Sequence, residues 1–175
     1  MPLGVRDLWS ALRAGPGARA ELEEACRDYH NARAAFALSS GRAALWLALK
    51  ALKRVLPDRK RVILPAYTCP TVGRAVQEAG LQGPCADVSP TDFNIAAEQV
   101  ESLVDDTILA VIAPHMFGSP CDIAALQRIC NSADVALIED LAQAFGAKCN
   151  GQVIGTFGDL GFTSLGGARA CGDTG

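Results

Sequence analysis

The sequence predicts an α/β domain in which helices flank a mostly parallel sheet in three layers. Strand-like and helix-like segments alternate from about residue 18 onward, which is typical of this fold class. Two of the strand-like segments, 108–113 and 135–138, are unbroken apolar runs, as expected for strands buried on both faces. No repeat, linker or low-complexity tract interrupts the alternation. We therefore expect an N-terminal helical segment at 1–34 and a single domain at 35–175.

The first elements are predicted from spacing and from small residues. A helix is expected over 19–31, where apolar residues recur at helical spacing. A short apolar run at 36–38 is expected to form the first strand, and it ends at a Ser-Ser-Gly sequence. The next helix, 42–55, is apolar on nearly every face in its first half, which predicts that it is buried. The two serines before it can serve as its N-cap.

The rest of the chain continues the alternation. Strands are expected at 61–64, 85–88, 108–113, 135–138 and 160–165, and helices at 72–79, 96–103 and 121–131. An Asn-Gly pair predicts a hairpin turn within 148–152. Ligands of parallel sheets gather at the carboxyl ends of the strands. The residues that follow each strand are therefore the first candidates for a functional site.

The composition argues against several classes of protein. Half of the 175 residues are hydrophobic and 20% are charged, unlike a disordered chain. A net charge of −3 and a pI near 5.3 provide no basic stripe for a nucleic-acid partner. No apolar run approaches the roughly 20 residues of a membrane span, and the N-terminus lacks the apolar core of a signal peptide. A cytoplasmic protein without membrane contact is expected.

The cysteines and histidines do not indicate a metal site. The chain has seven cysteines and two histidines, and no two cysteines form a Cys-x-x-Cys pair. In a chain without a secretion signal, we expect reduced and mostly buried thiols and no bound metal.

Several strand ends carry residues that could act chemically. Ser40, Gly41 and Arg42 open a helix whose N–H groups suit an anion such as phosphate, although the same residues can serve only as a cap. His115 follows the 108–113 strand and is by default a structural histidine. The 135–138 strand ends at Glu139-Asp140, which predicts either a buried carboxylate with a cationic partner or a solvated strand end. Neither a dinucleotide fingerprint nor a P-loop is present.

Taken in order, these segments resemble the DegT/DnrJ family of pyridoxal-phosphate-dependent aminotransferases, which mostly aminate keto-sugars attached to nucleotides. The most specific element is 135–146, VALIEDLAQAFG. Further matching segments are 65–68, 92–95, 115–122 and 157–159. The resemblance runs from about residue 36 to residue 175. It implies a fold type I large domain, a homodimer with active sites at its interface, and small-molecule substrates, namely a nucleotide-linked sugar and an amino donor.

The resemblance implies three residues around the ring of pyridoxal phosphate. Asp140 matches the aspartate that pairs with the pyridine nitrogen, where a carboxylate keeps the ring protonated and able to accept electrons. Gln143 matches the residue near the phenolic oxygen of the cofactor. Cys69 stands where many members carry an aromatic ring that stacks on the cofactor, so some of that stacking, about 0.5–1.5 kcal/mol, is forgone.

The same resemblance implies a phosphate site. Gly41 and Arg42 match its loop, with Ser40 beside them, and Ser164 matches a serine that also reaches the phosphate. Arg42 replaces the usual threonine or serine, which adds charge but loses a short hydroxyl contact.

Two departures from the family pattern concern catalysis. Arg169 occupies the position of the lysine that holds the cofactor as a Schiff base, and a guanidinium cannot supply the free amine. The sequence also stops at Gly175, within the large domain of the family. We therefore expect this chain alone to be inactive. The alternatives are a decayed, non-catalytic homologue that at most binds pyridoxal phosphate, and a general α/β module that binds another phosphorylated ligand.

Overall fold

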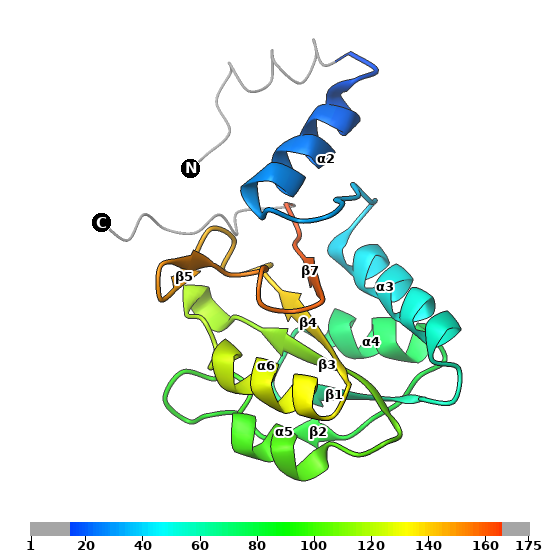
Figure 1. The fold of residues 1–175 in the computed structure, drawn as a ribbon, viewed down its shortest axis with the longest axis vertical. Helices are drawn as coiled ribbons and strands as arrows, with labels where there is room; N and C mark the ends of the chain where they lie inside the picture. The colour runs from blue at the N-terminus through cyan, green and yellow to red at the C-terminus, as the bar shows by residue number, and fades with distance from the viewer. Residues whose placement is uncertain (1–14, 166–175) are drawn as a thin grey trace.

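The computed structural model describes residues 15–165, and these form the three-layer α/β fold that the sequence predicts (Figure 1). Within this range one sheet has five strands in the order β2-β1-β3-β4-β7, and each neighbouring pair is parallel. Its strands are β1 (Arg61–Pro65), β2 (Cys85–Ala86), β3 (Ile108–Pro114), β4 (Ala136–Asp140) and β7 (Leu160–Phe162). The successive crossovers therefore place all five carboxyl ends at one edge of the sheet.

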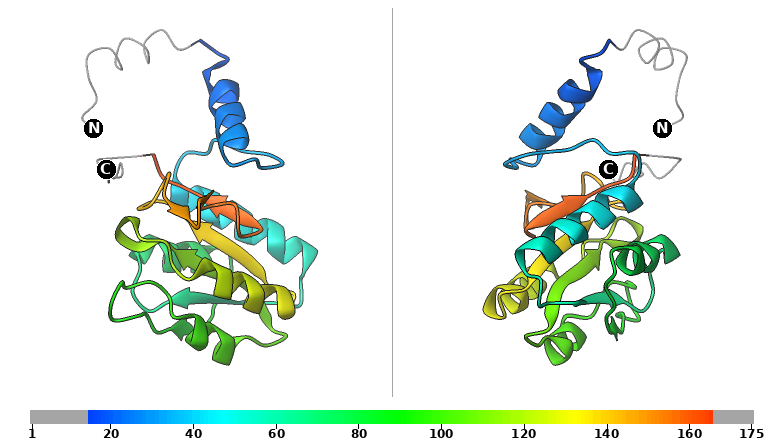
Figure 2. Two further views of the ribbon diagram at one scale, coloured as in Figure 1. Left: turned by 60° about the vertical axis from the view of Figure 1, so that its left-hand side comes forward. Right: turned by 90° about the vertical axis from the view of Figure 1, so that its right-hand side faces the viewer.

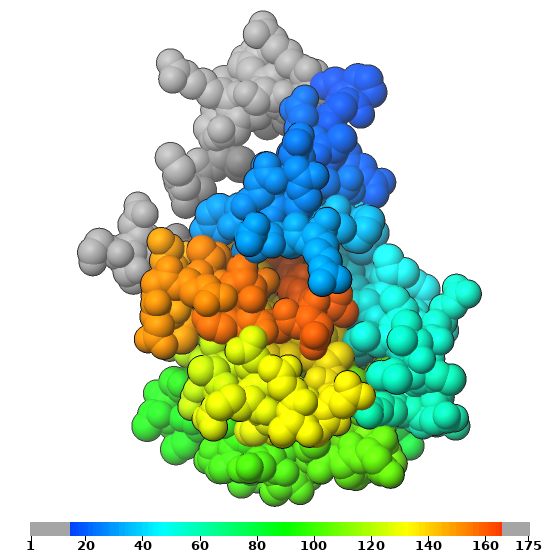
Figure 3. Space-filling model, viewed as in Figure 1, coloured from blue at the N-terminus to red at the C-terminus, as the bar shows by residue number. Residues whose placement is uncertain are grey.

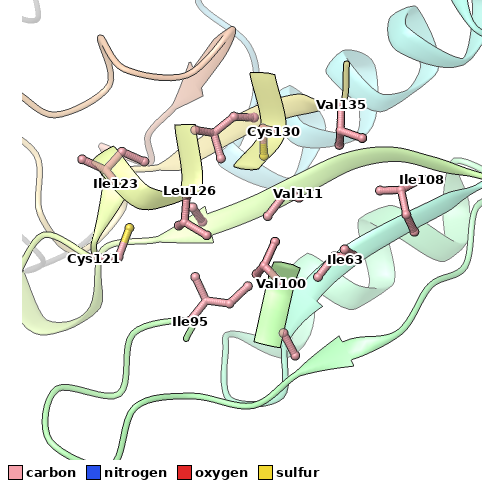
Figure 4. Packing of buried hydrophobic residues seen from close by; sticks show 13 residues of the cluster. Ile63, Ile95, Val100, Ile108, Val111, Cys121, Ile123, Leu126, Cys130 and Val135 are labelled. Atoms are coloured by element: carbon pink, nitrogen blue, oxygen red, sulfur yellow. The ribbon is translucent and has the colours of Figure 1, made fainter. Parts of the chain in front are cut away.

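Helices cover both faces of this sheet (Figure 2). On one face, α3 (Gly41–Val55) and α4 (Pro70–Glu78) pack on apolar side chains that include Val62 and Ile138. On the other face, α5 (Ala97–Leu103) and α6 (Ile123–Ser132) pack on Ile63, Val111 and Leu137 (Figure 4). Neighbouring residues of β4 therefore face opposite layers, as the pleat of a strand requires.

The central strand β3 is buried along its whole length. Its β-branched residues have neighbours on both faces, and each such side chain contributes about 1.5–3 kcal/mol by its burial. β3 and β4 run in register from Ala110 opposite Ala136 to Pro114 opposite Asp140. The two strands therefore end level, and this brings His115 next to Asp140.

Most predicted elements are confirmed within a few residues, but the short strand at 36–38 is wrong. That segment has no regular secondary structure, and the Phe36 side chain is 74% exposed. Three apolar residues cannot form a strand without a neighbour to accept their backbone hydrogen bonds, and no strand between residues 15 and 165 pairs with them.

The prediction that the helix at 42–55 is buried nearly all round is also wrong. Only one face of α3 is buried, and its buried residues are Gly41, Leu45 and Leu49. On the other side of the helix, Trp46 is 37% exposed and Leu47 is 46% exposed. The helix packs on the sheet and beside α4, and the large side chains of its opposite face are left exposed (Figure 2).

The smaller elements complete the described chain. The 3-10 turn η1 (Met116–Gly118) follows β3, and the strands β5 (Lys148–Cys149) and β6 (Gln152–Val153) form the predicted hairpin. At the tip of this hairpin, Asn150 and Gly151 have φ angles of 52° and 82°, which suits a tight turn of the mirror-image type.

The N-terminal helix α2 (Ala18–Tyr29) lies apart from the sheet and contains no buried residue. Its end stacks on the loop after β4 through Tyr29 and Phe145, whose ring centroids are 5.8 Å apart. The Glu23 carboxylate also accepts a hydrogen bond from the Ala37 backbone N–H. In Figure 3 the blue surface of α2 and the segment after it rests on the orange surface of the later loops.

The six cysteines in the described range are free thiols, as predicted, but the expectation that most are buried is wrong. Only Cys121 and Cys130 are buried, and Cys85 is exposed. Burial raises the pKa of the Cys130 thiol to about 12, with a smaller contribution from the charge of Asp159. A thiol of that kind is inert at neutral pH.

Candidate functional site

The loops that follow β1, β3 and β4 line a pocket that is partly open to solvent. Its lining residues are Thr68, Cys69, Pro114, His115, Met116, Asp140, Ala142 and Gln143. The pocket lies where a parallel sheet is expected to hold its ligand. Among the residues described, no group of histidine, cysteine and carboxylate side chains could hold a metal ion, and no helix is long and apolar enough to cross a membrane.

Asp140 is held firmly at this edge of the sheet. It is 7% exposed and lies on the same face of β4 as Ile138, toward α3 and α4. Its Oδ1 accepts a hydrogen bond from the Ala142 N–H at 3.0 Å, and its backbone carbonyl accepts one from the His115 N–H at 3.2 Å. The first bond restrains the carboxylate, and the second holds the backbone from which it extends.

Gln143 is oriented by the loop after β3. Its Oε1 accepts a hydrogen bond from the Phe117 backbone N–H at 3.1 Å, so the other end of the amide is its donor NH₂ group. Phe117 has a φ of 53°, an unusual conformation for a bulky residue, and this turn aims its N–H at Gln143. Cys69 is the N-cap residue of α4, and its Sγ lies 3.1 Å from Thr71 Oγ1.

Ser40, Gly41 and Ser164 come together at the carboxyl end of β7, which pairs with the end of β4 through Phe162 and Asp140. Ser40 is the N-cap of α3, and its Oγ accepts a hydrogen bond from the Ala43 N–H at 3.2 Å. A Cβ on Gly41 would lie only 3.2 Å from the Ser164 Cβ, which explains a glycine at this point. The Arg42 guanidinium lies elsewhere, 4.0 Å from the Glu78 carboxylate at the end of α4.

Glu139, the neighbour of Asp140, is fully buried on the opposite face of β4. Its Oε1 accepts hydrogen bonds from the N–H groups of Phe157 at 2.8 Å and Gly158 at 2.7 Å. Its Oε2 accepts one from Gly155 N–H at 2.7 Å and lies 3.2 Å from His115 Nε2. The alternative of a solvated strand end is therefore wrong, since neither Glu139 nor Asp140 is exposed.

The sequence-based expectation that a buried carboxylate here has a cationic partner is also wrong, because the partner of Glu139 is not a cation. The Cys121 backbone N–H donates to His115 Nδ1 at 3.2 Å, so that nitrogen carries no hydrogen and Nε2 is the donor to Glu139. His115 is thus a neutral structural histidine with both ring nitrogens bonded, as its default interpretation predicted. Burial would raise the pKa of the Glu139 carboxyl, but hydrogen bonds from His115, Gly158 and Gly155 outweigh it and lower that pKa.

Sequence reasoning missed several parts of this site. The Glu139-Asp140 pair was the only signal for a buried carboxylate, and nothing local pointed to the 155–158 loop as its partner. Thr68 and Met116 line the pocket without having been singled out. Arg169, the residue at the lysine position, lies outside the described residues.

The sequence profile of the DegT/DnrJ/EryC1/StrS aminotransferase family matches residues 9–175. The chain belongs to this family. GDP-perosamine synthase of Vibrio cholerae is 32% identical over 152 residues, which are 87% of this chain and 40% of that protein. PseC of Helicobacter pylori, an aminotransferase of pseudaminic acid biosynthesis, has the same fold, with a TM-score of 0.86 at 20% identity over 94% of this chain and 46% of its own.

The DegT/DnrJ/EryC1/StrS aminotransferases depend on pyridoxal phosphate. One solved relative, the Escherichia coli GDP-4-keto-6-deoxy-D-mannose-3-dehydratase with bound hydrated pyridoxal phosphate, has a TM-score of 0.72 at 26% identity over 79% of this chain and 37% of its own. The chain spans about two fifths of the length of the curated relatives it matches.

The groups at the site fit this cofactor. Asp140 presents a carboxylate and Gln143 an amide NH₂ group in one pocket, and these are the kinds of group that a protonated ring nitrogen and a phenolic oxygen require. The N-terminus of α3, with Gly41 lacking a Cβ against Ser164, forms a cradle suited to a phosphate.

Proposed function

We propose that this chain is the N-terminal part of a pyridoxal-phosphate-dependent aminotransferase that acts on a nucleotide-linked keto-sugar and works as a homodimer. The observation that carries the proposal is the placement of Asp140 and Gln143 in one pocket, with the α3 N-terminus and Ser164 at the end of β7, the strand that pairs with β4. The matching family and the sugar-modifying relatives support the substrate class.

Each residue has a defined part in this proposal. Pyridoxal phosphate, when bound, supplies an electron sink for the substrate carbon. Asp140 holds a proton on the pyridine nitrogen, which its buried carboxylate can do because charge-assisted hydrogen bonds are stronger away from water. Gln143 donates to the phenolic oxygen. The first turn of α3 and the Ser164 hydroxyl would hold the phosphate.

The cofactor contacts are tested by titration of the purified chain with pyridoxal phosphate. Asp140→Asn keeps the size of the side chain but removes its charge, and an interaction with a charged group contributes about 1.5–3 kcal/mol. We expect the dissociation constant to rise by at least about tenfold. Asp58→Asn, at an exposed position, is the matched control and should bind as the parent chain does. Equal affinity of the Asp140→Asn chain and the parent would refute the assignment.

Arg169 supports the narrower proposal that the chain binds the cofactor without a covalent link and does not catalyse transamination alone. A guanidinium keeps its proton at any physiological pH and cannot attack an aldehyde. Treatment with borohydride in the presence of pyridoxal phosphate should therefore leave position 169 unmodified, as checked by peptide mass spectrometry. A reduced adduct at this position, or transamination by the chain alone, would contradict this proposal.

A further inference from the structure

The Glu139 carboxylate forms hydrogen bonds with two separate parts of the chain. One part is the end of β4 with His115, and the other is the 155–158 loop that leads into β7. Four N–H groups converge on its two oxygens from these two directions. A fully buried carboxylate with no cationic partner is costly, and this arrangement provides the donors that offset the cost.

Asp140 and Ser164 lie at the ends of the two strands that this carboxylate ties together. Glu139 directly precedes Asp140, and His115 bonds both residues, the first through its side chain and the second through its backbone N–H. Ser164 is two residues beyond the end of β7. The separation between Asp140 and Ser164 therefore depends on where β7 lies relative to β4.

The pairing of β7 with β4 is short and needs support. It covers only Leu160–Phe162, and within the described residues β7 has β4 as its sole neighbour in the sheet. The loop before β7 lies directly against β4, since a Cβ on Gly158 would come within 2.6 Å of the Leu137 carbonyl oxygen. The N–H groups of Gly155, Phe157 and Gly158 donate hydrogen bonds to the Glu139 carboxylate, and these bonds hold the loop in place.

We propose that Glu139 is a positioning residue that sets the distance between the ring-nitrogen contact at Asp140 and the phosphate contact at Ser164. This proposal rests on the proposed function, because it takes these two residues as the contacts at opposite ends of pyridoxal phosphate. Glu139 itself faces away from the pocket and acts through its two neighbours. The binding of a ligand that contacts both Asp140 and Ser164 therefore depends on Glu139. The binding of a ligand that contacts only Asp140 does not.

The test compares pyridoxal phosphate with pyridoxal, which has the same ring but no phosphate. Glu139→Gln replaces one acceptor oxygen by an NH₂ group that faces N–H donors. We expect the ratio of the dissociation constant of pyridoxal to that of pyridoxal phosphate, which measures the advantage given by the phosphate, to fall. A fall of about tenfold is expected, the lower end of the effect known for residues that orient metal ligands. If Glu139 had a purely structural role, the substitution would raise both dissociation constants by the same factor and leave their ratio unchanged.

Two further variants make the comparison specific. His115→Asn removes one of the four donors to Glu139 and keeps an acceptor near the Cys121 N–H, so a smaller fall in the ratio is expected. If the Glu139→Gln chain does not fold, the ratio measured for His115→Asn tests the positioning role of Glu139 instead. Glu101→Gln, at an exposed position of α5, controls for loss of a negative charge and should leave the ratio unchanged.

A measurement without ligand separates this proposal from the proposed function. The backbone amide signals of Gly41 and Ser164 in nuclear magnetic resonance spectra should shift in Glu139→Gln and remain in place in Glu101→Gln. An unchanged ratio in a folded Glu139→Gln chain, or unchanged Gly41 and Ser164 signals, would overturn the positioning role. If the parent chain binds neither ligand, the proposed function fails, and the amide signals alone decide whether Glu139 couples the two strand ends.

Discussion

Replacing Glu139 by alanine is expected to lower the free energy of unfolding by several kcal/mol, because each buried donor left without an acceptor costs about 1–3 kcal/mol. The substitution leaves the His115 Nε2–H and three backbone N–H groups without their acceptor in a site closed to water. Urea unfolding followed by circular dichroism measures the loss. Glu101→Ala, on the exposed face of α5, should change the free energy of unfolding by less than about 0.5 kcal/mol. A similar small change in Glu139→Ala would contradict the arrangement described.

The same carboxylate gives the stability a defined pH dependence. The pKa of Glu139 is lowered on folding from an ordinary value of 4.5, so its contribution is complete above about pH 4.5 and is lost as the pH falls through the lower folded value. Glu139→Gln lacks this titrating group, and its stability should fall less steeply than that of the parent as the pH is lowered below about 4.5. Other carboxyls with lowered pKa, including Asp92 and Asp105, remain in both chains and cancel in the comparison. Identical slopes would exclude a charged Glu139 in the folded state.

Gly83→Ala is expected to have the largest effect of any single methyl addition in the described fold. A Cβ at this position would overlap the Val62 carbonyl oxygen and come within 2.6 Å of the Val62 carbonyl carbon and nitrogen. The flanking residues pair with β1, the Val62 N–H with the Gln82 carbonyl at 2.9 Å and the Leu64 N–H with the Pro84 carbonyl at 3.3 Å. The backbone cannot give way without breaking these bonds. We expect a loss on the order of 4 kcal/mol or more, with little folded protein recovered.

Gly73→Ala is the matched control for this prediction. Gly73 lies within α4, and its added Cβ would meet the Leu64 Cδ1 at 3.9 Å, an ordinary contact. Alanine favours the helix over glycine by about 0.5–1 kcal/mol, so this variant should be slightly more stable than the parent in urea. A destabilised Gly73→Ala chain, or a Gly83→Ala chain as stable as the parent, would show that the packing around β1 differs from that described.

The sequence was sufficient to predict the fold because its buried strands are marked by local composition. The β-branched run at 108–113 and the shorter run at 135–138 each predicted a central strand, and both are buried. The apolar residues at 36–38 and on the outer face of α3 misled the same reasoning. Hydrophobicity along the chain indicates that a segment could be buried, but only the arrangement of neighbours decides whether it is.

The candidate site could be predicted only in part for a related reason. Asp140, Gln143 and Ser40 follow strands or begin helices, so their places relative to the sheet edge follow from local pattern. The role of Glu139 depends on a loop that follows it by 16 to 19 residues and contributes backbone N–H groups rather than side chains. Backbone donors leave no mark in a sequence, so the partner expected for this carboxylate was a cationic side chain.

The level ends of β3 and β4 also determine where the chain can tolerate a change in length. One residue inserted within Ile108–Pro114 would reverse the facing of every later side chain in β3 and move His115 away from Asp140. One residue inserted between Asn150 and Gly151 would only lengthen a hairpin whose tip makes no close contact at Gly151. Insertions and deletions among related sequences should therefore be absent from the two central strands and collect at the hairpin tip.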